Sequence, residues 1–512
     1  MLKAIKINPA DNVAVVPQDV NAGEQVQVVE TGEVFTATEF IKAGHKMALV
    51  DFKAGDTVVK YGIPIGKMIS DCPKGGWIHC HNVEDITAEL CTGYCEQYRN
   101  AGRKIMAFPR PNGDFGISNY IMIFSTSVAA NAMAEELANK TDVIWMVCDK
   151  NRLENGKISD FTKMVITKTA QNPNIYAAMI VGSEEDNALN EAITQEIKTT
   201  GKQAVYVGVK SGVCEHKLAD NVKVLETWKK EAASLKREPC SMEGFTMAIH
   251  CGGSDWTTAL SGNPTLGVAS DLVVEQGGFV IMDEWGGLPG SEHLLASHAV
   301  TRKVGLGVID KVMDTRERFL RDTGKPVEAT NPYPSNKEGG ITTLVEKSTG
   351  NIKKAGSSGL QGILKMATRP TTPGVYLQDQ PCGGPSATGI YAAMSGCHLN
   401  IFVTGVGYVY YEIPHMLGIR MTGNPDTFKV EDYKLDFNAG VVIEGKPMQE
   451  AGKDLFEYII AVAEGREVPK NEAVKCKAFP MYYYEDEFNE AIYCRVKDYK
   501  EEVMKRVDAI KA

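Results

Sequence analysis

The sequence predicts a multidomain α/β protein: a small all-β domain at the N-terminus, then two domains built on parallel sheets. Three observations support this. At 512 residues the chain is too long for one compact core. Short β-rich runs punctuated by Gly, Asp and Pro fill roughly the first 85 residues. From about residue 103, apolar strands alternate with amphipathic helices. The predicted domains span residues 1–95, 96–235 and 236–512.

The first predicted domain contains five β-rich runs. They are VAVV (13–16), EQVQVVE (24–30), KMALVDF (46–52), DTVVKYG (56–62) and GWIHCHNV (76–83). On a strand, alternate side chains share a face, so His79 and His81 would stand side by side. Such a pair can bind a metal or a polar substrate, but it can also be two solvated surface histidines.

The other two predicted domains show strand and helix runs in alternation. In the middle domain the strand runs are 120–126, 142–148, 176–183 and 203–209, and the helix runs are 128–140 and 186–201. In the third domain the runs 245–253, 277–285, 374–381 and 399–407 read as strands, most of them followed by Gly-rich loops where a ligand could bind. Further helices are predicted at 84–104 and 488–512, the second closing the chain, and 226–239 is a helix or a linker.

Composition narrows the functional classes. A formal net charge of -10 argues against nucleic acid as the main partner. There is no apolar run that could cross a bilayer and no signal peptide, so we expect a cytoplasmic protein without a membrane partner. The twelve cysteines form no regular framework. GxxxxGK[ST] and a strand followed by GxGxxG are both absent, so no nucleotide cofactor is expected.

Two strand ends in the third domain carry acidic residues. HCGGSD places Ser254 and Asp255 after two glycines, and IMDEWGGLPGSEH contains Glu284 and Glu292. Asp255, Glu284 and Glu292 are the candidate ligands for Mg²⁺, Mn²⁺ or Fe²⁺, and Ser254 is a candidate substrate contact. Alternatively, Asp255 is a helix cap and Glu292 only favours the dipole of a helix N-terminus.

The stretch NPYPSNKEGGITT combines amide, ammonium, hydroxyl and bare backbone groups. Such a loop suits a sugar acid, because it can bind hydroxyls and a carboxylate together. Lys337 could act as a base if burial lowered its pKa, although a lysine in a polar loop is usually just solvated. The candidate substrate contacts here are Asn336, Gly339, Gly340, Thr342 and Thr343.

The stretch QPCGGPSATGIYAAMSGCH joins a Gly-rich loop to a helix whose N-terminus could hold an anion. We add His398, at its end, to the candidate substrate contacts. The neighbouring Cys397 is better explained by core packing, because a Cys–His pair in sequence is not a dyad in space.

Taken in order, these motifs resemble the altronate and galactarate dehydratase family. The resemblance rests on GHKMALVDFKAGDTVVKYGIPIG…GWIHCHNVE, CGGSD, GNPTLGVASD, NPYPSNKEGGITTLVEKSTG and KAGSS. It implies an N-terminal β-clip module of the SAF type, a middle domain used in homodimerisation and a Rossmann-like C-terminal domain with a metal site. The implied cofactor is Fe²⁺ or a similar divalent ion, and the implied substrate is a small anionic hydroxy acid.

The implied reaction is dehydration of a hexonate or hexarate to a 2-keto-3-deoxy acid. The proton α to the carboxylate is removed and the β-hydroxyl leaves, so a metal or cationic donors must stabilise an enediolate. Lys337 is the candidate catalytic residue within the third domain. The N-terminal module is expected to deliver His79 and His81 to the same site, as polar groups rather than as a metal site of their own.

Several positions depart from the family pattern. Ser118 and Val406 stand where arginines are expected, and cysteines are missing at Ala129 and near Ser183. Arginine grips carboxylates with two parallel hydrogen bonds, so a changed substrate is expected. Three hypotheses follow: a sugar-acid hydro-lyase, a β-elimination lyase acting on a sulfonated or shorter hydroxy acid, and a paralogue that binds a sugar acid or a partner protein without catalysis.

Overall fold

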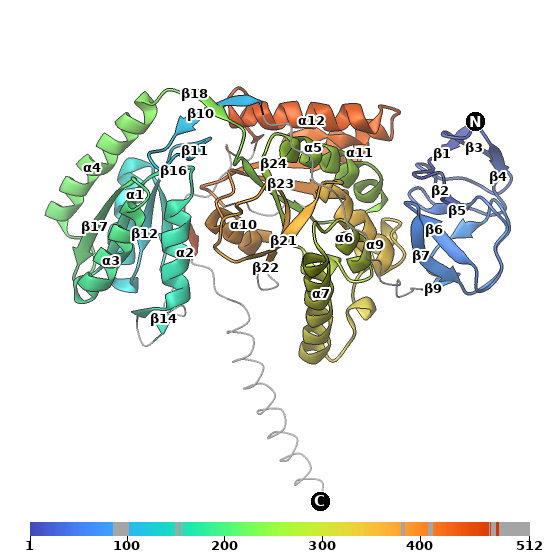
Figure 1. Cartoon of the computed structure of the whole chain (residues 1–512), viewed down its shortest axis with the longest axis horizontal. Coiled ribbons are helices and arrows are strands. Elements are labelled where there is room, and N and C mark those ends of the chain that lie inside the picture. Colours follow the sequence, from blue (N-terminus) through green and yellow to red (C-terminus); the bar gives the residue numbers. More distant parts are fainter. Residues whose placement is uncertain are drawn as a thin grey trace, which may run out of the picture.

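The computed structural model describes residues 1–84, 102–148, 153–154, 157–379, 385–407, 413–470, 472 and 478–480. Three units lie in a row, with the C-terminal unit between the N-terminal and middle units (Figure 1). We call them the N-terminal, middle and C-terminal domains. The predicted α/β multidomain architecture, with a small β-domain first, is confirmed.

The N-terminal domain consists of three small sheets with the strand orders β1-β3-β4, β2-β5-β8 and β6-β7-β9. Every β-rich run predicted there contains at least one of these strands. The strands are β1 (Leu2–Ala4), β2 (Val13–Val15), β3 (Gln25–Val28), β4 (Val34–Thr36), β5 (Lys46–Ala48), β6 (Thr57–Lys60), β7 (Ile63–Met68), β8 (Trp77–Ile78) and β9 (Val83–Glu84).

The histidine pair does not lie on a strand, so the prediction that both imidazoles share one strand face is wrong. β8 ends at Ile78, and the chain turns before β9. The turn is fixed by the Asn82 side chain, whose Oδ1 accepts a hydrogen bond from the His79 backbone N–H at 2.9 Å. His79 is half-buried and His81 is exposed. The Trp77 indole lies against both imidazole rings, with centroid separations of 5.7 and 4.6 Å.

The middle domain is a five-stranded parallel sheet with the order β17-β16-β12-β13-β26. Successive residues of β12 face opposite layers: Ile123 packs with helices α1 and α4, and Phe124 with α2 and α3. The strands are β12 (Tyr120–Ser125), β13 (Ile144–Val147), β16 (Ile175–Ser183), β17 (Gln203–Val209) and β26 (Ala478–Pro480), and the helices are η1 (Val128–Ala130), α1 (Asn131–Thr141), α2 (Asp160–Gln171), η3 (Glu184–Asp186), α3 (Asn187–Lys198) and α4 (Glu215–Ser234).

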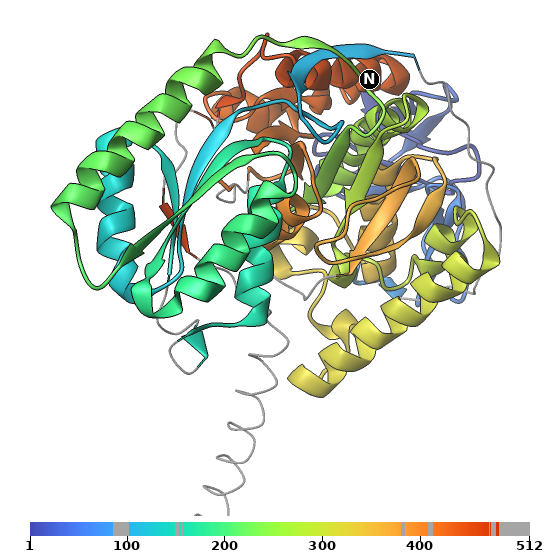
Figure 2. The same ribbon diagram turned by 60° about the vertical axis from the view of Figure 1, so that its left-hand side comes forward.

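One strand of this sheet comes from the far end of the chain. β26 pairs in parallel with β13, although more than 300 residues separate them in sequence. A small antiparallel sheet, β11-β10-β18, also joins the middle and C-terminal domains, because β10 (Lys104–Pro109) pairs with β11 (Phe115–Gly116) and β18 (Glu238–Ser241). A short hairpin, β14 (Leu153–Glu154) and β15 (Lys157–Ile158), precedes α2. Figure 2 shows the middle domain from a second direction.

The C-terminal domain is a seven-stranded sheet with the order β21-β22-β20-β19-β23-β24-β25, parallel throughout. Apart from the edge strand β21, this is the doubly wound order 3-2-1-4-5-6, with β19 as strand 1 and β23 as strand 4. The strands are β19 (Thr246–Cys251), β20 (Phe279–Met282), β21 (Leu360–Lys365), β22 (Gly374–Asp379), β23 (Leu399–Thr404), β24 (Leu417–Thr422) and β25 (Phe437–Asn438). The predicted Rossmann-like sheet is therefore confirmed, and its switch point lies between β19 and β23.

Helices cover both faces of this sheet. α5 and α12 pack on one face and α10 on the other. These helices and their neighbours are η4, a π-helical turn (Thr258–Gly262), α5 (Asn263–Glu275), α10 (Pro385–Met394), α11 (Pro425–Glu431), η8 (Ala439–Val442) and α12 (Met448–Ala463). The α10 side is shared with the middle domain, because Asn172 Nδ2, just after α2, donates to the carbonyls of Ala393 and Cys397 at 2.9 Å each.

A long helical excursion separates β20 from β21 and carries much of the candidate site. Its elements are η5 (Trp285–Gly287), α6 (Glu292–Ser297), α7 (Arg302–Thr323), η6 (Val327–Ala329), α8 (Pro334–Glu338), α9 (Leu344–Ile352) and η7 (Lys353–Ala355). The excursion places α9 against β7 of the N-terminal domain. It therefore lies between the parallel sheet and the N-terminal domain.

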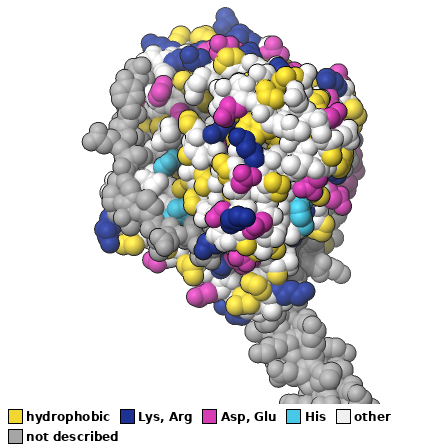
Figure 3. Space-filling view, turned by 90° about the vertical axis from the view of Figure 1, so that its right-hand side faces the viewer, with side chains coloured by type: hydrophobic (Ala, Val, Ile, Leu, Met, Phe, Trp, Pro, Cys, Tyr) yellow, Lys and Arg dark blue, Asp and Glu magenta, His cyan; other side chains and the backbone are white. Residues whose placement is uncertain are grey.

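The outer face of the N-terminal domain carries interspersed acidic and basic side chains, as Figure 3 shows. None of the helices in the described part of the chain combines the length and apolar character that a bilayer span needs. Of the predicted helices, 488–512 and nearly all of 84–104 lie outside the described residues.

Candidate active site

A cavity of about 660 Å³ opens at the carboxyl ends of β19, β20 and β23. Residues 251–255 after β19 and 284–287 after β20 form two of its walls, and Val406 after β23 reaches it from the third strand. The excursion contributes Asn331, Asn336 and Lys347. The cavity therefore lies at the switch point, where open parallel sheets bind ligands.

A compact polar cluster forms one wall of the cavity. The Lys354 ammonium is fully buried and forms an ion pair with Glu284. Its Nζ also donates to Asn351 Oδ1 at 2.6 Å and lies 3.4 Å from Cys251 Sγ. The Glu284 carboxylate in turn accepts the backbone N–H of Cys251 at 3.1 Å. Lys354 therefore holds the ends of β19 and β20 together.

Asp255 lines the cavity and also caps the helical segment that follows it. Its Oδ1 accepts hydrogen bonds from the Thr257 hydroxyl at 2.6 Å and from the backbone N–H groups of Thr257 and Thr258 at 2.9 and 3.0 Å. Burial raises the pKa of this carboxyl group. The cap interpretation of Asp255 is thus correct, and it does not remove the residue from the cavity.

Lys347, on α9, places its ammonium group in the cavity wall. Its Nζ donates to Asn331 Oδ1 at 2.6 Å and to Asn336 Oδ1 at 2.8 Å. Burial lowers the pKa of Lys347 to about 8. Among the described residues that line the cavity, no other lysine and no arginine is present.

A buried ionic triad attaches the N-terminal domain to the C-terminal domain. Lys46 Nζ lies 3.0 Å from both Glu346 carboxylate oxygens, and Lys60 Nζ lies 2.9 Å from Glu346 Oε1. All three side chains are at most 3% exposed. Burial alone would raise the pKa of Glu346, but the two ammonium groups hold it below the usual range for a glutamate.

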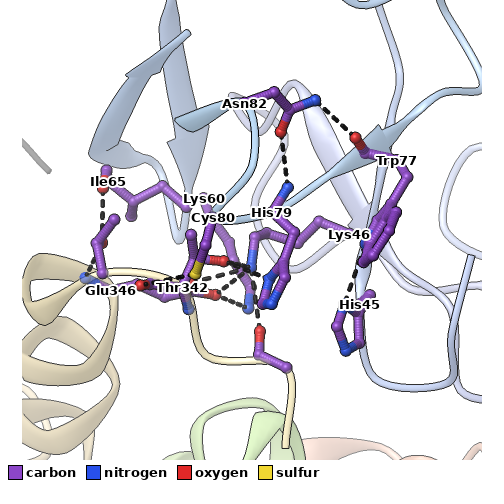
Figure 4. Close-up of polar contacts among 12 residues, drawn as sticks. His45, Lys46, Lys60, Ile65, Trp77, His79, Cys80, Asn82, Thr342 and Glu346 are labelled. Atoms are coloured by element: carbon purple, nitrogen blue, oxygen red, sulfur yellow. Dashed lines mark hydrogen bonds and ion pairs between the residues drawn. The ribbon is translucent and has the colours of Figure 1, made fainter. Parts of the chain in front are cut away.

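At the same interface, side chains of the N-terminal domain contact the loop that precedes α9, as Figure 4 shows. Lys46 Nζ donates to Thr342 Oγ1 at 2.8 Å, and His79 Nδ1 lies 3.0 Å from that oxygen. Cys80 Sγ lies 3.4 Å from the Thr342 carbonyl oxygen. Thr343 caps α9 and also donates its hydroxyl to the Ile65 carbonyl at 2.9 Å. The N-terminal domain therefore fixes the start of the helix that carries Lys347.

Two imidazole rings in this interface are held neutral. Trp77 Nε1 donates to His45 Nδ1 at 3.0 Å, and His45 and His79 lie with centroids 4.3 Å apart. Burial lowers the pKa of His45 to about 4, with the positive charges of Lys46 and Lys42 adding to the effect. Burial and Lys46 lower the pKa of His79 to about 3.

We predict that these rings make the folded protein acid-sensitive. Below pH 6.5 the unfolded chain binds protons at both histidines while the folded chain does not, so the free energy of unfolding falls as the pH drops towards 4. Guanidinium denaturation between pH 7.5 and 4.5 measures this slope. His45→Gln retains an acceptor for Trp77 and should flatten the slope. A slope unchanged in this variant would contradict the prediction.

The structure brings together only part of the predicted site. Asp255, Glu284, Ser254 and Asn336 line the cavity. Gly339 packs against Asp255, where an added Cβ would come 2.7 Å from the Asp255 Cβ. Gly340, Thr342 and Thr343 lie next to the cavity but face the N-terminal domain: Gly340 has a φ of +87°, and an added Cβ would come 2.4 Å from the Gly44 carbonyl oxygen. His79 joins this interface through Thr342.

Lys337, His81, Glu292 and His398 do not line the cavity. Lys337 and His81 are exposed. The Glu292 carboxylate accepts the Gly290 N–H at 2.6 Å at the start of α6, as expected of a residue that stabilises a helix N-terminus. His398 is buried between the Thr246 N–H and the Phe115 carbonyl oxygen. Because His398 precedes β23, it lies at the amino ends of the strands, opposite the cavity.

The described residues do not fit the expected divalent metal. Glu292 lies away from Asp255 and Glu284, and the Glu284 carboxylate is already neutralised by Lys354. Across the described ranges, no group of three or more His, Cys, Asp or Glu side chains could hold an ion. Fe²⁺ remains an expectation from the family.

Sequence reasoning missed Lys46, Lys60, Glu346, Lys347 and Lys354. A weak signal existed for both lysines: Lys46 begins the apolar run KMALV, and Lys60 interrupts the run TVVKY. A lysine within an apolar strand needs a buried counter-charge. The sequence did not show which residue supplies that counter-charge, because Lys46 and Glu346 are 300 positions apart.

Comparison with known proteins assigns all three domains to one family. The altronate/galactarate dehydratase SAF domain matches residues 2–86. The second domain of D-galactarate dehydratase/altronate hydrolase matches residues 107–233, and the C-terminal region of D-galactarate/altronate dehydratase matches residues 242–485.

Individual relatives are similar to this chain over different shares of its length. Altronate dehydratase of Escherichia coli is 28% identical over 493 residues, covering 91% of this chain and 96% of that protein. The β subunit of (2R)-sulfolactate sulfo-lyase of Chromohalobacter salexigens is 29% identical over 71% of this chain and 94% of that subunit. The α subunit of the Paracoccus pantotrophus sulfo-lyase is 55% identical over 47 residues, 9% of this chain and 70% of that subunit.

The fold, the cavity at the switch point and these matches define a carbon–oxygen lyase. All three domains match models of the same family. The chain belongs to the altronate/galactarate dehydratase family.

Proposed function

We propose that this lyase dehydrates a hydroxy acid with one carboxylate, of the aldonate type, to a 2-keto-3-deoxy acid. The observation that carries the proposal is the described part of the cavity lining, which offers amides, hydroxyls and bare backbone together with the carboxylates of Asp255, Asp283 and Glu284. It contains one lysine and no arginine. A monocarboxylate with several hydroxyls suits such a lining better than a dianion does.

The position of Val406 supports the preference for one carboxylate. It lines the cavity where the family pattern leads us to expect an arginine, and its side chain is about half exposed. A guanidinium group there would grip a carboxylate with two hydrogen bonds, which valine cannot do. Ser118, the other departure, lies away from the cavity, with its carbonyl accepting a hydrogen bond from Arg110 at 2.7 Å.

The test is a substrate panel under anaerobic conditions, with Fe²⁺, with Mn²⁺ and with neither. We expect 2-keto-3-deoxy acids to form from aldonates, with kcat/KM at least about tenfold higher than for the matching aldarates, since a charged hydrogen bond contributes about 1.5–3 kcal/mol. No turnover of any aldonate or aldarate would overturn the proposal. Binding seen by calorimetry without turnover would instead indicate a binding protein.

A second candidate is elimination of sulfite from a sulfonated hydroxy acid. It is favoured by the similarity of 71% of this chain to the β subunit of one (2R)-sulfolactate sulfo-lyase and of a 47-residue stretch to the α subunit of another. Sulfolactate belongs in the same panel, and release of sulfite without 2-keto-3-deoxy products would select this candidate.

A further inference from the structure

Both side-chain amides that accept hydrogen bonds from Lys347 also donate a hydrogen bond from their nitrogen to a backbone carbonyl. Asn336 Nδ2 donates to the Ser254 carbonyl oxygen at 2.8 Å, and Asn331 Nδ2 donates to the Gly286 carbonyl oxygen at 2.8 Å. Each amide therefore donates from its nitrogen to the segment that follows β19 or β20, so its Oδ1 must face Lys347. The two acceptors around Nζ are fixed, and both are uncharged.

This setting differs from that of the other buried lysines at this end of the molecule. Lys46 and Lys60 share the Glu346 carboxylate, and Lys354 has Glu284. Those three lysines are structural cations. Lys347 forms hydrogen bonds with two amides and lies 4.9 Å from the centroid of the Tyr333 ring.

Two fixed neutral acceptors suit an uncharged amine. An amine has two N–H donors and one lone pair. With both N–H groups directed at Asn331 and Asn336, the remaining tetrahedral direction of Nζ carries the lone pair. Burial without a carboxylate partner lowers the pKa of Lys347 to about 8, so a useful fraction of amine is present near neutral pH. A cation whose only task is to hold a carboxylate would gain from the opposite shift.

We propose that Lys347 is the general base that removes the proton α to the substrate carboxylate. This inference rests on the proposed lyase function and deepens it. The α C–H bond breaks, its electron pair moves into the carboxylate to give an enediolate, and Nζ gains the proton. The β C–O bond then breaks as the electron pair forms the C=C bond. The departing hydroxide combines with the proton held by Lys347, so one water leaves and the enol becomes the 2-keto acid.

The pH dependence of kcat/KM tests this role. For the wild-type enzyme acting on its best aldonate, kcat/KM should rise with pH and level off above a pKa of about 8. If Lys347 instead bound the substrate carboxylate as a cation, kcat/KM would fall as the pH rises, because the ammonium group would lose its proton. Lys347→Met should lower kcat by about 10²–10⁴-fold and remove the rising limb.

Lys347→Arg separates charge from basicity. Arginine keeps the positive charge but holds its proton throughout this pH range, so the variant should be as slow as Lys347→Met. Exchange of the substrate α-proton with D₂O, followed by NMR, should be lost in both variants. Thermal unfolding and calorimetric binding of the aldonate confirm that each variant is folded and still binds.

The outcomes are distinguishable. Turnover by the wild type together with a Lys347→Met variant within tenfold of it overturns the base role alone. An active Lys347→Arg variant, or a kcat/KM that falls above pH 8, also overturns the base role. Either result would show that Lys347 binds the substrate carboxylate as a cation. No turnover by the wild type on any panel member overturns the proposed function, and the base role with it.

Discussion

Replacing Glu346 with glutamine is expected to destabilise the folded protein by about 3–5 kcal/mol, the usual cost of breaking a buried ion pair from one side. Glutamine keeps the shape of the side chain but leaves the ammonium groups of Lys46 and Lys60 buried beside a neutral amide. Both lysines are nearly inaccessible to water, so solvent cannot screen their repulsion. Guanidinium denaturation at pH 7.5 measures the loss.

Two further variants sharpen this experiment. In a Lys60→Met, Glu346→Gln double variant only one uncompensated charge stays buried, so part of the lost stability should return. Lys53→Gln breaks the exposed pair of Lys53 with Asp71 at 2.7 Å and should cost less than about 1 kcal/mol. If Glu346→Gln cost no more than this surface variant, the triad would not hold the interface.

Four of the seven strands of the C-terminal domain, β19, β20, β22 and β23, were predicted because their signal is local. The strands β21, β24 and β25 were not predicted. The run predicted at 245–253 contains β19 (Thr246–Cys251), and the run at 399–407 contains β23 (Leu399–Thr404). Apolar residues bounded by glycines specify a buried parallel strand without reference to distant residues. The placement of a cavity at these strand ends follows from the sheet order.

The side chains of the site were harder to predict, because their roles depend on which way a helix faces. Glu346 and Lys347 are adjacent on α9, and consecutive helical residues point about 100° apart. Glu346 therefore enters the interface with the N-terminal domain, while Lys347 enters the cavity. Lys337, the lysine favoured from sequence, lies on the five-residue helix α8 and faces solvent.

The conformation of the histidine motif was also not predictable from the strand pattern. HCHN suggested a strand with paired imidazoles, but Asn82 accepts the His79 N–H and closes a turn. The turn sends His79 to the Thr342 hydroxyl and leaves His81 at the surface. A polar residue that bonds to the nearby backbone competes with strand formation, and here that local bond determined the outcome.

Substituting arginine for Val406 is expected to raise kcat/KM for aldarates by about 10–100-fold relative to aldonates. Val406 lines the cavity, is about half exposed, and is anchored by its backbone N–H to the Gly253 carbonyl oxygen at 3.1 Å. A longer side chain can therefore enter the cavity without displacing the core. The guanidinium group would add a bidentate contact to a second carboxylate, and charged hydrogen bonds contribute about 1.5–3 kcal/mol.

The matched control is Val406→Met, which adds length without charge. It should leave the ratio of aldarate to aldonate kcat/KM within about threefold of wild type, because a thioether has no N–H or O–H to donate to a second carboxylate. The measurement is this ratio for pairs of acids that differ only at the terminal carbon. A Val406→Arg enzyme that handles both acids as the wild type does would show that the second carboxylate does not reach this strand end. The preference for one carboxylate would then have to come from another wall of the cavity.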